Sequence, residues 1–260
     1  EGEHPVTGGR VTLIPGAASG IGAAIARRIA GTGNSLLLHA SGRTEEKVRA
    51  LEALAETLRS EGAPVETVFA DFDTPGAAQS VVDVALARFS RLDALVANAG
   101  FADRTPLRQA APETLSRSLR GMTEAFFALA TAAADPLARG GAGRIVAISS
   151  FVAHRFAEGE LFPVTAAAKA GIEALAKALA VELGPEGVTV NCVVPGYTRK
   201  DASGHRAMSA EAMEAMAART PTRRIAEPDD VAALVAFLLG PDARQITGQC
   251  IHVDGGLCLG

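Results

Sequence analysis

Seven short apolar runs, separated by longer amphipathic segments, limit most strongly what this chain can fold into. The runs are rich in Val, Ile and Leu and show little polar alternation, which is typical of strands buried on both faces. They lie at 10–14, 35–39, 65–70, 93–97, 143–148, 188–194 and 249–253. The intervals with helical periodicity lie at 20–31, 44–61, 76–90, 113–134, 165–183 and 228–239.

Strand–helix alternation over the whole length predicts an α/β fold with a parallel, doubly wound sheet covered by helices on both faces. We expect one domain over 10–260, because no linker, repeat or low-complexity tract interrupts the alternation. Residues 1–9 are expected to be a flexible N-terminus or the remnant of a tag. The least regular part, 195–222, follows the sixth run, where an insertion would form a lid over a ligand crevice.

Charge and composition exclude several classes of function. The 25 basic and 29 acidic residues give a net charge of −4, whereas a nucleic-acid-binding protein is expected to carry a basic excess. No apolar stretch reaches the roughly 18 residues of a membrane span. Three scattered cysteines favour neither a disulfide framework nor a metal cage, so we expect no metal and a cytoplasmic location.

A glycine-rich turn follows the first run, with the sequence Pro15-Gly16-Ala17-Ala18-Ser19-Gly20-Ile21-Gly22. Glycines in the first strand–helix turn permit a tight bend and a close approach of the backbone to a phosphate. The N-terminus of the following helix then attracts the anion. The turn therefore indicates a dinucleotide site, although three glycines also occur in ordinary turns.

The spacing G-x-x-x-G-x-G, with Asn98-Ala99-Gly100 after the fourth run, resembles the short-chain dehydrogenase/reductase family. The resemblance extends over essentially the whole chain. The other matching segments are Asp71, Ile148-Ser149-Ser150, Lys169-Ala170-Gly171, Pro195-Gly196, Ile246-Thr247-Gly248-Gln249 and Val253-Asp254-Gly255-Gly256.

The resemblance implies a single Rossmann domain with a seven-stranded parallel sheet, usually assembled as a tetramer or dimer, that binds NAD(P)(H) and a small-molecule substrate. It assigns cofactor contacts residue by residue. These are Gly16, Ser19, Gly20, Ile21 and Gly22 around the pyrophosphate, Asp71 and Phe72 at the adenine, Asn98, Ala99 and Gly100 on the adenosine side, Lys169 at the nicotinamide ribose, and Pro195, Gly196 and Thr198 beside the nicotinamide.

The end of the second run bears on which dinucleotide binds. An acid there would bind the ribose 2′-hydroxyl of NAD(H) and repel a 2′-phosphate, but Ala40 occupies that position. Ser41 offers a hydroxyl and Arg43 a fork of donors suited to phosphate. We expect NADP(H) to be preferred, with NAD(H) as the alternative if Arg43 is only a solvated loop residue.

The catalytic positions implied by the resemblance are a Ser, a Tyr, a Lys four residues after the Tyr, and an Asn on the preceding long helix. Ser150 and Lys169 fit the Ser and the Lys, but Thr165 stands at the Tyr position and Met122 at the Asn position. A phenol has a pKa of about 10 and an aliphatic hydroxyl one nearer that of water, about 15.7, so threonine is a far weaker acid. Tyr197 and His154 are candidate substitutes, although we expect that Tyr197 packs under the lid and that His154 is an exposed loop residue without a catalytic function.

Three functions follow from this departure. The first is an oxidoreductase that interconverts a ketone and a secondary alcohol, with its acid–base group displaced from the tyrosine position. An apolar substrate is favoured by the apolar residues expected near the crevice, which are Phe151, Phe156, Phe162 and Met208. The second is a dinucleotide-binding protein with little or no redox activity. The third is a lyase or isomerase that uses Ser150, Lys169 and His154 on the same fold.

Overall fold

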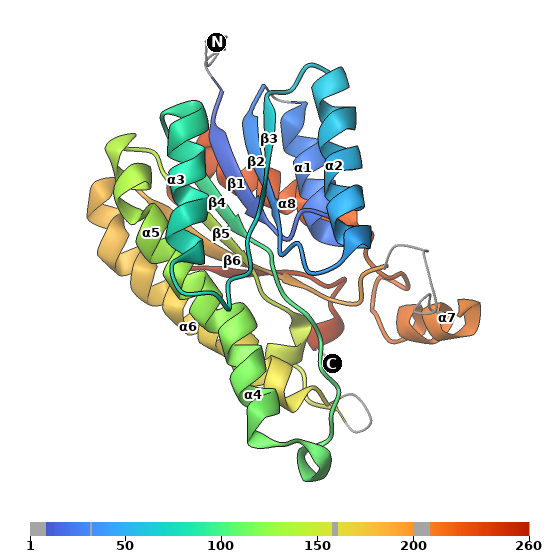
Figure 1. Ribbon diagram of the computed structural model, residues 1–260. Helices are drawn as coiled ribbons and strands as arrows, with labels where there is room; N and C mark the ends of the chain where they lie inside the picture. Colours follow the sequence, from blue (N-terminus) through green and yellow to red (C-terminus); the bar gives the residue numbers. More distant parts are fainter. Residues whose placement is uncertain (1–8, 32, 158–160, 200–208, 260) are drawn as a thin grey trace.

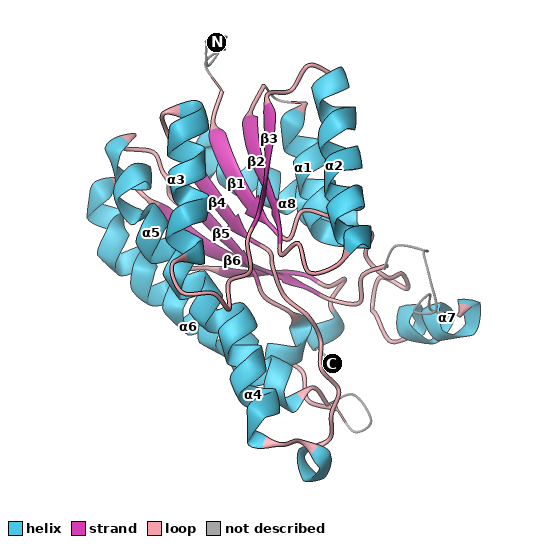
Figure 2. Cartoon of the chain, in the orientation of Figure 1, coloured by secondary structure: helices cyan, strands magenta, loops and turns pink. Residues whose placement is uncertain are grey.

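The computed structural model describes residues 9–31, 33–157, 161–199 and 209–259. Most of the expected flexible N-terminus and part of the expected lid therefore lie outside the described residues. Seven parallel strands form one sheet in the order β3-β2-β1-β4-β5-β6-β7. This confirms the predicted α/β class and the doubly wound, Rossmann-type sheet (Figures 1 and 2).

Each predicted run forms a strand, with ends that shift by one residue at most. The strands are β1 (Val11–Pro15), β2 (Ser35–Ala40), β3 (Val65–Phe69), β4 (Ala94–Ala97), β5 (Arg144–Ile148), β6 (Thr189–Pro195) and β7 (Cys250–Val253). The helices are α1 (Gly20–Ala30), α2 (Glu45–Ser60), α3 (Ala77–Phe89), α4 (Pro112–Ser118), α5 (Ala125–Arg139), α6 (Pro163–Leu183), α7 (Ala210–Ala218) and α8 (Pro228–Leu239). In the described residues, no helix is both long enough and apolar enough to cross a membrane.

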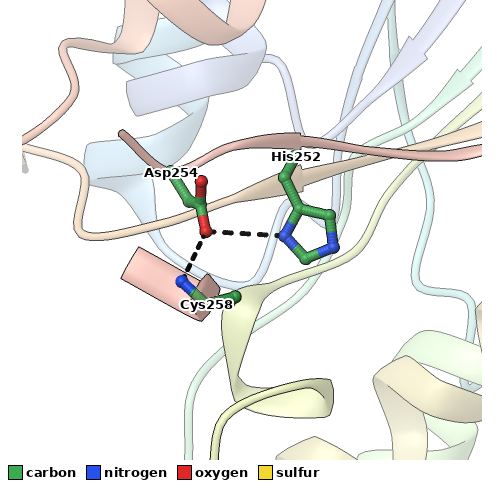
Figure 3. A group of neighbouring side chains, drawn as sticks. All are labelled: His252, Asp254 and Cys258. Carbon is green, nitrogen blue, oxygen red and sulfur yellow. Dashed lines mark hydrogen bonds and ion pairs between the residues drawn. The ribbon is translucent and has the colours of Figure 1, made fainter. Parts of the chain in front are cut away.

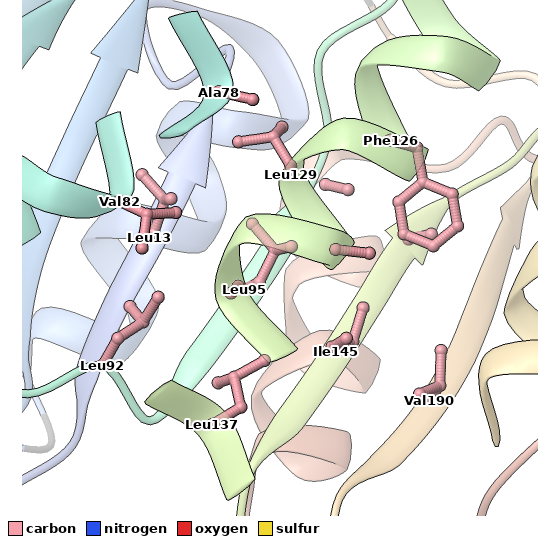
Figure 4. Close-up of a cluster of buried hydrophobic side chains, with 14 of the residues drawn as sticks. Leu13, Ala78, Val82, Leu92, Leu95, Phe126, Leu129, Leu137, Ile145 and Val190 are labelled. Carbon is pink, nitrogen blue, oxygen red and sulfur yellow. The ribbon is translucent and has the colours of Figure 1, made fainter. Parts of the chain in front are cut away.

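Two helical layers cover the sheet. Helices α3, α5 and α6 pack on one face, and α1, α2 and α8 pack on the other (Figure 1). The first layer encloses the larger apolar cluster, in which Leu13, Leu95 and Ile145 of the sheet meet Phe126 and Leu129 of α5 (Figure 4). Because the central strands are buried on both faces, their sequences carry almost no polar residues.

The strand order places a crevice at the carboxyl ends of the central strands. The chain runs outward from β1 to β3 and then returns to β4 on the other side of β1. Connections on the two sides diverge there, and open α/β sheets bind their ligands at such a switch point. The crevice therefore lies at the ends of β1, β4, β5 and β6.

Two segments differ from the sequence prediction. The helix expected over 113–134 is divided into α4, a π-helical segment (Leu119–Glu124) and α5. The ring of Phe101 packs over Gly121 inside that segment, where a Cβ would lie 2.9 Å from Cε1 of Phe101. The stretch 195–222 contains helix α7. Its N-cap residue is Ser209, whose hydroxyl accepts a hydrogen bond from the backbone N–H of Ala212 at 3.2 Å.

We predict that Leu95→Ala lowers the free energy of unfolding by about 2–5 kcal/mol, because Leu95 is fully buried in the central strand β4 and its removal leaves a cavity. The matched control is Leu107→Ala, since Leu107 is 79% exposed and should change stability by less than about 0.5 kcal/mol. Urea denaturation of both variants measures the difference. Equal losses would mean that the core does not lie where the fold places it.

Candidate active site

The glycine-rich turn lies directly against the end of β4. The side-chain amide of Asn98 donates to the carbonyl oxygen of Gly16 at 2.9 Å. A Cβ on Gly16 would lie 3.0 Å from Cα of Ala99, and a Cβ on Gly22 would lie 2.6 Å from Nδ2 of Asn98. Gly16 also has a φ of 73°, which side chains disfavour. Glycine at positions 16 and 22 thus allows the turn after β1 to lie against the residues that follow β4.

This cradle fits a pyrophosphate. Helix α1 begins at Gly20, and its N-cap residue Ser19 makes no side-chain capping bond, so the Ser19 side chain does not occupy the positive end of the helix dipole, where an anion is stabilised. Gly20 has a φ of 55° and open space at its Cβ position. Ile21 follows on the partly buried face of the same turn. The predicted pyrophosphate residues therefore lie together at one helix N-terminus.

The residues predicted at the adenosine end also lie together, but they are engaged with one another. Arg43 donates to both carboxylate oxygens of Asp71, from Nε and Nη2, at 2.6 Å each, and Nη2 also donates to Asp73. These bonds raise the pKa of Arg43, and the Arg43 bond lowers the pKa of Asp71. The ring of Phe72 stacks on His39 with 4.4 Å between centroids. Ser41 accepts only a long bond, 3.5 Å, from the backbone N–H of Arg43.

Lys169 is buried at the centre of the site. Its Nζ donates to the carbonyl oxygen of Ile148, the last residue of β5, at 2.6 Å. A Cβ on Gly100 would lie 3.2 Å from this Nζ, so the ends of β4 and β5 both contact the ammonium group. Burial lowers the pKa of Lys169 to about 8. The pKa of Lys169 therefore lies near neutral pH, where a general acid or base is most effective.

Ser150 is the second residue after β5 and caps the short 3₁₀ turn Phe151–Ala153. Its Oγ accepts a long bond, 3.4 Å, from the backbone N–H of Val152. Ser150 is partly exposed, so its hydroxyl can turn toward a ligand in the crevice.

Thr165 has its hydroxyl committed to a neighbouring loop. Its Oγ1 accepts from the backbone N–H of Asp103 at 2.8 Å and donates to the Asp103 carbonyl at 3.4 Å. The carboxylate of Asp103 in turn pairs with Arg117 of α4 at 2.7 Å. Thr165 is 3% exposed. The threonine therefore fastens the 101–106 loop to α6, a role that its sequence position did not reveal.

Met122, at the asparagine position, lies in the π-helical segment and is 1% exposed. A Cβ on Gly100 would lie 3.5 Å from its Sδ, so Met122 contacts the same glycine as Lys169. A thioether neither donates nor relays a proton. The side of Lys169 that faces the π-helical segment is therefore apolar.

Glu173, which sequence reasoning missed, lies one turn after Lys169 on the buried face of α6. It is 6% exposed and accepts from the hydroxyl of Ser149 and from Nε2 of His154, the latter at 2.8 Å. The spacing of four residues from Lys169 was the available signal, because residues four apart share a helix face. His154 is thus held under the Ser150 turn and is not directed into the crevice.

The remaining predicted residues line the end of β6. Gly196 packs against Asp254, where a Cβ would lie 2.7 Å from the Asp254 Cα, so only glycine fits after Pro195. The hydroxyl of Thr198 donates to the carbonyl of Gly196 at 3.1 Å. The ring of Tyr197 meets Phe151 edge-on at 5.0 Å and belongs to a small apolar cluster with Phe162.

Comparisons with known proteins agree with this geometry. The sequence profile of the enoyl-(acyl carrier protein) reductase family matches residues 16–258. The chain is 34% identical over 254 residues to an L-rhamnose 1-dehydrogenase (NAD(P)(+)) from Azotobacter vinelandii, covering 95% of this chain and 96% of that protein. It is 31% identical over 251 residues to the 3-oxoacyl-(acyl-carrier-protein) reductase FabG of Escherichia coli, covering 96% and 98%.

Solved structures give the same result. A short-chain dehydrogenase/reductase from Serratia marcescens superposes with a TM-score of 0.87 at 30% identity, covering 98% of this chain and 100% of that one. An acetoin dehydrogenase from Salmonella typhimurium superposes with a TM-score of 0.86 at 26% identity, covering 96% of both chains. The protein therefore belongs to the short-chain dehydrogenase/reductase family of oxidoreductases.

Proposed function

We propose that this protein is an NADP(H)-dependent oxidoreductase that interconverts a ketone and a secondary alcohol on a small, apolar substrate. The observation that carries the proposal is the position of Lys169, whose ammonium group lies under Gly100 and beside the Ser150 turn at the switch point of the sheet. Relatives named as a 3-oxoacyl reductase and an L-rhamnose dehydrogenase support carbonyl chemistry.

The cofactor would lie across the ends of β1 and β4. Gly16, Gly20 and Gly22 would admit its pyrophosphate to the N-terminus of α1, and Lys169 would hold the nicotinamide ribose. When bound, NADPH supplies the hydride that the substrate carbon receives. Asn98 fixes the cradle through its bond to Gly16, and Gly196 leaves room for the nicotinamide side of the site.

Lys169 is the group we assign to proton transfer. Ser150 would hydrogen-bond the carbonyl oxygen, and the Lys169 ammonium would give that oxygen a proton, directly or through a water, becoming a neutral amine that solvent then reprotonates. A pKa of about 8 makes this transfer favourable near neutral pH. Threonine at position 165 lacks the phenol ring of tyrosine, and the smaller side chain would leave room for substrate or water near Lys169.

The engaged hydroxyl of Thr165 also favours a second candidate, a dinucleotide-binding protein with weak redox activity. Both hydrogen bonds of Thr165 go to Asp103. The buried Met122 stands where the family has an asparagine that holds a water on the proton path, and a thioether cannot take this role. NADPH binding without turnover on a panel of ketones would select this candidate over the oxidoreductase. The lyase or isomerase alternative needs a mobile base, whereas His154 is held by Glu173.

An apolar substrate is supported by the crevice wall next to Ser150. Phe151, Phe162 and Tyr197 pack together there, with Phe151 directly following the serine. Met208, another apolar residue expected near the crevice, lies outside the described residues.

The preference for NADP(H) rests on Ala40 and Arg43. Ala40 removes the acid that would repel a 2′-phosphate, and the Arg43 side chain is 55% exposed at the adenosine end. Asp71 and Asp73 compete for the same guanidinium, so we expect the preference to be moderate.

We predict that Arg43→Ala weakens NADPH binding about tenfold and leaves NADH binding unchanged, because a charged hydrogen bond contributes about 1.5–3 kcal/mol. Asp73→Asn should strengthen NADPH binding by up to about fivefold, since it releases one donor of Arg43 from an exposed pair. Fluorescence titration with both cofactors measures these changes. Equal NADPH and NADH affinities in the unmodified protein would contradict the proposal.

We predict that ketone reduction is constant below pH 8 and falls about tenfold per pH unit above it, because burial lowers the pKa of Lys169 from 10.5 to about 8 and only the ammonium form carries the proton. Lys169→Met should abolish turnover. Thr165→Tyr should raise the rate by at most about 10²–10⁴-fold and extend activity to higher pH, since a phenol has a pKa of about 10.

The controls for this prediction are His154→Ala and Tyr197→Phe. Each should retain most of the activity, because His154 is bound to Glu173 and Tyr197 packs on Phe151. A large loss in either variant would move the proton donor to that residue. If Thr165→Ala lost as much activity as Lys169→Met, the threonine would be identified as the proton donor.

We also predict that the protein forms a homo-oligomer through an apolar surface on α5 and α6. The exposed face of α6 carries Ala167, Ala170 and Val181, and Phe127 of α5 is 52% exposed. A groove of about 360 Å³ beside Phe156 and Phe162 continues this surface. Light scattering at micromolar concentration should give a tetramer or dimer, and a monomer would refute the prediction.

A further inference from the structure

The turn that follows β7 brings an imidazole, a carboxylate and a thiol together. His252 lies on β7, Asp254 follows the strand, and Cys258 lies in the 3₁₀ turn Leu257–Leu259. Nδ1 of His252 is 3.5 Å from Oδ2 of Asp254, and the candidate ligand atoms of all three residues lie within 4.8 Å of one another (Figure 3). The proposed reduction reaction uses none of these three side chains.

The carboxylate at the centre of this group is fixed in position by the backbone. Oδ1 of Asp254 accepts from the N–H of Gly256, and Oδ2 accepts from the N–H of Cys258, both at 2.9 Å. The side chain of Asp254 is only 7% exposed. Each carboxylate oxygen can accept more than one bond, so lone pairs remain. Hydrogen bonds that orient a carboxylate in this way are a regular feature around metal ligands.

The spacing suits a small divalent ion. Zinc bonds of about 2.0–2.3 Å place neighbouring ligands of a tetrahedral ion about 3.3–3.8 Å apart. The His252–Asp254 separation of 3.5 Å already falls in that range, and closing the longest separation requires a movement of about 1 Å. His252 is 31% exposed, which gives an ion access from solvent.

We propose that His252, Asp254 and Cys258 form a Zn²⁺ site, with water in the fourth position. A mixed set of nitrogen, oxygen and sulfur ligands suits this borderline-soft ion better than Mg²⁺ or Ca²⁺, which select oxygen ligands alone. The proposal is independent of the proposed oxidoreductase activity, because it concerns a separate set of residues.

Binding would exchange a proton for the ion. Burial, together with the hydrogen bond to Asp254, raises the pKa of the Cys258 thiol to about 11, so the thiol is protonated at neutral pH. Zinc binds the thiolate, and coordination therefore releases one proton per site.

The turn around Asp254 is hydrogen-bonded to two other parts of the chain. The backbone N–H of Gly196 donates to the Val253 carbonyl at 3.0 Å, and that of Thr222 donates to the Gly255 carbonyl at 3.2 Å. An ion bound at Asp254 would therefore stabilise both of these contacts.

Co²⁺ titration of the full chain without an affinity tag tests the site, since Co²⁺ replaces Zn²⁺ and reports thiolate coordination as a charge-transfer absorption. We expect the band to saturate at one ion per chain, to disappear on addition of Zn²⁺, and to be absent in Cys258→Ser. His252→Ala should weaken Zn²⁺ binding by more than about tenfold in a chelator competition assay.

Cys250→Ser is the matched control, because Cys250 lies on the same strand as His252 and belongs to no part of the proposed site. It should retain the band and the Zn²⁺ affinity, and circular dichroism should show that all variants are folded. An absent band, a band retained in Cys258→Ser, or one lost in Cys250→Ser would each overturn the proposal.

Discussion

The burial of one ammonium group is the constraint on which the site depends. Lys169 reaches from α6 to the Ile148 carbonyl and lies under Gly100, so the helix, the end of β5 and the end of β4 are tied through a single charge. Taking that charge out of water is costly, which lowers the pKa of Lys169 to about 8. The sheet order makes this possible, because it brings the ends of β4 and β5 side by side, next to the switch point between β1 and β4.

Thr165 gives its position on α6 a structural role in place of the catalytic role that tyrosine has in the family. Its hydroxyl holds the loop after β4 through Asp103, and Asp103 is held in turn by Arg117. A hydroxyl used in this way stabilises the wall of the crevice. In the proposed mechanism the acid–base role therefore passes to the neighbouring buried Lys169, with Glu173 buried one turn away on the same helix.

Most of the fold could be predicted from sequence because buried parallel strands have a strong apolar signal. Strand β1 and its glycine turn were located to within one residue. Helix α7 was missed because it is short and buries none of its residues, so no apolar stripe marks it. The π-helical segment around Met122 was missed because a change of winding leaves the apolar periodicity nearly intact.

The site was predictable only where a motif fixes the backbone. Gly16, Gly22 and Asn98 meet as their motif implies, because only glycine fits at positions 16 and 22 and the Asn98 amide donates to the Gly16 carbonyl. Long-range pairs were not predictable: Arg43 joins Asp71 and Asp73, and His154 joins Glu173, through side-chain contacts that no local spacing encodes.

Single-turnover reduction of a ketone with deuterated NADPH tests most directly whether Lys169 sustains redox chemistry without the tyrosine. The account predicts one deuterium on the carbonyl carbon of the alcohol product, and no product with Lys169→Met although that variant is folded. Tight NADPH binding with no deuterium transfer to any ketone, or equal transfer in Lys169→Met, would contradict it.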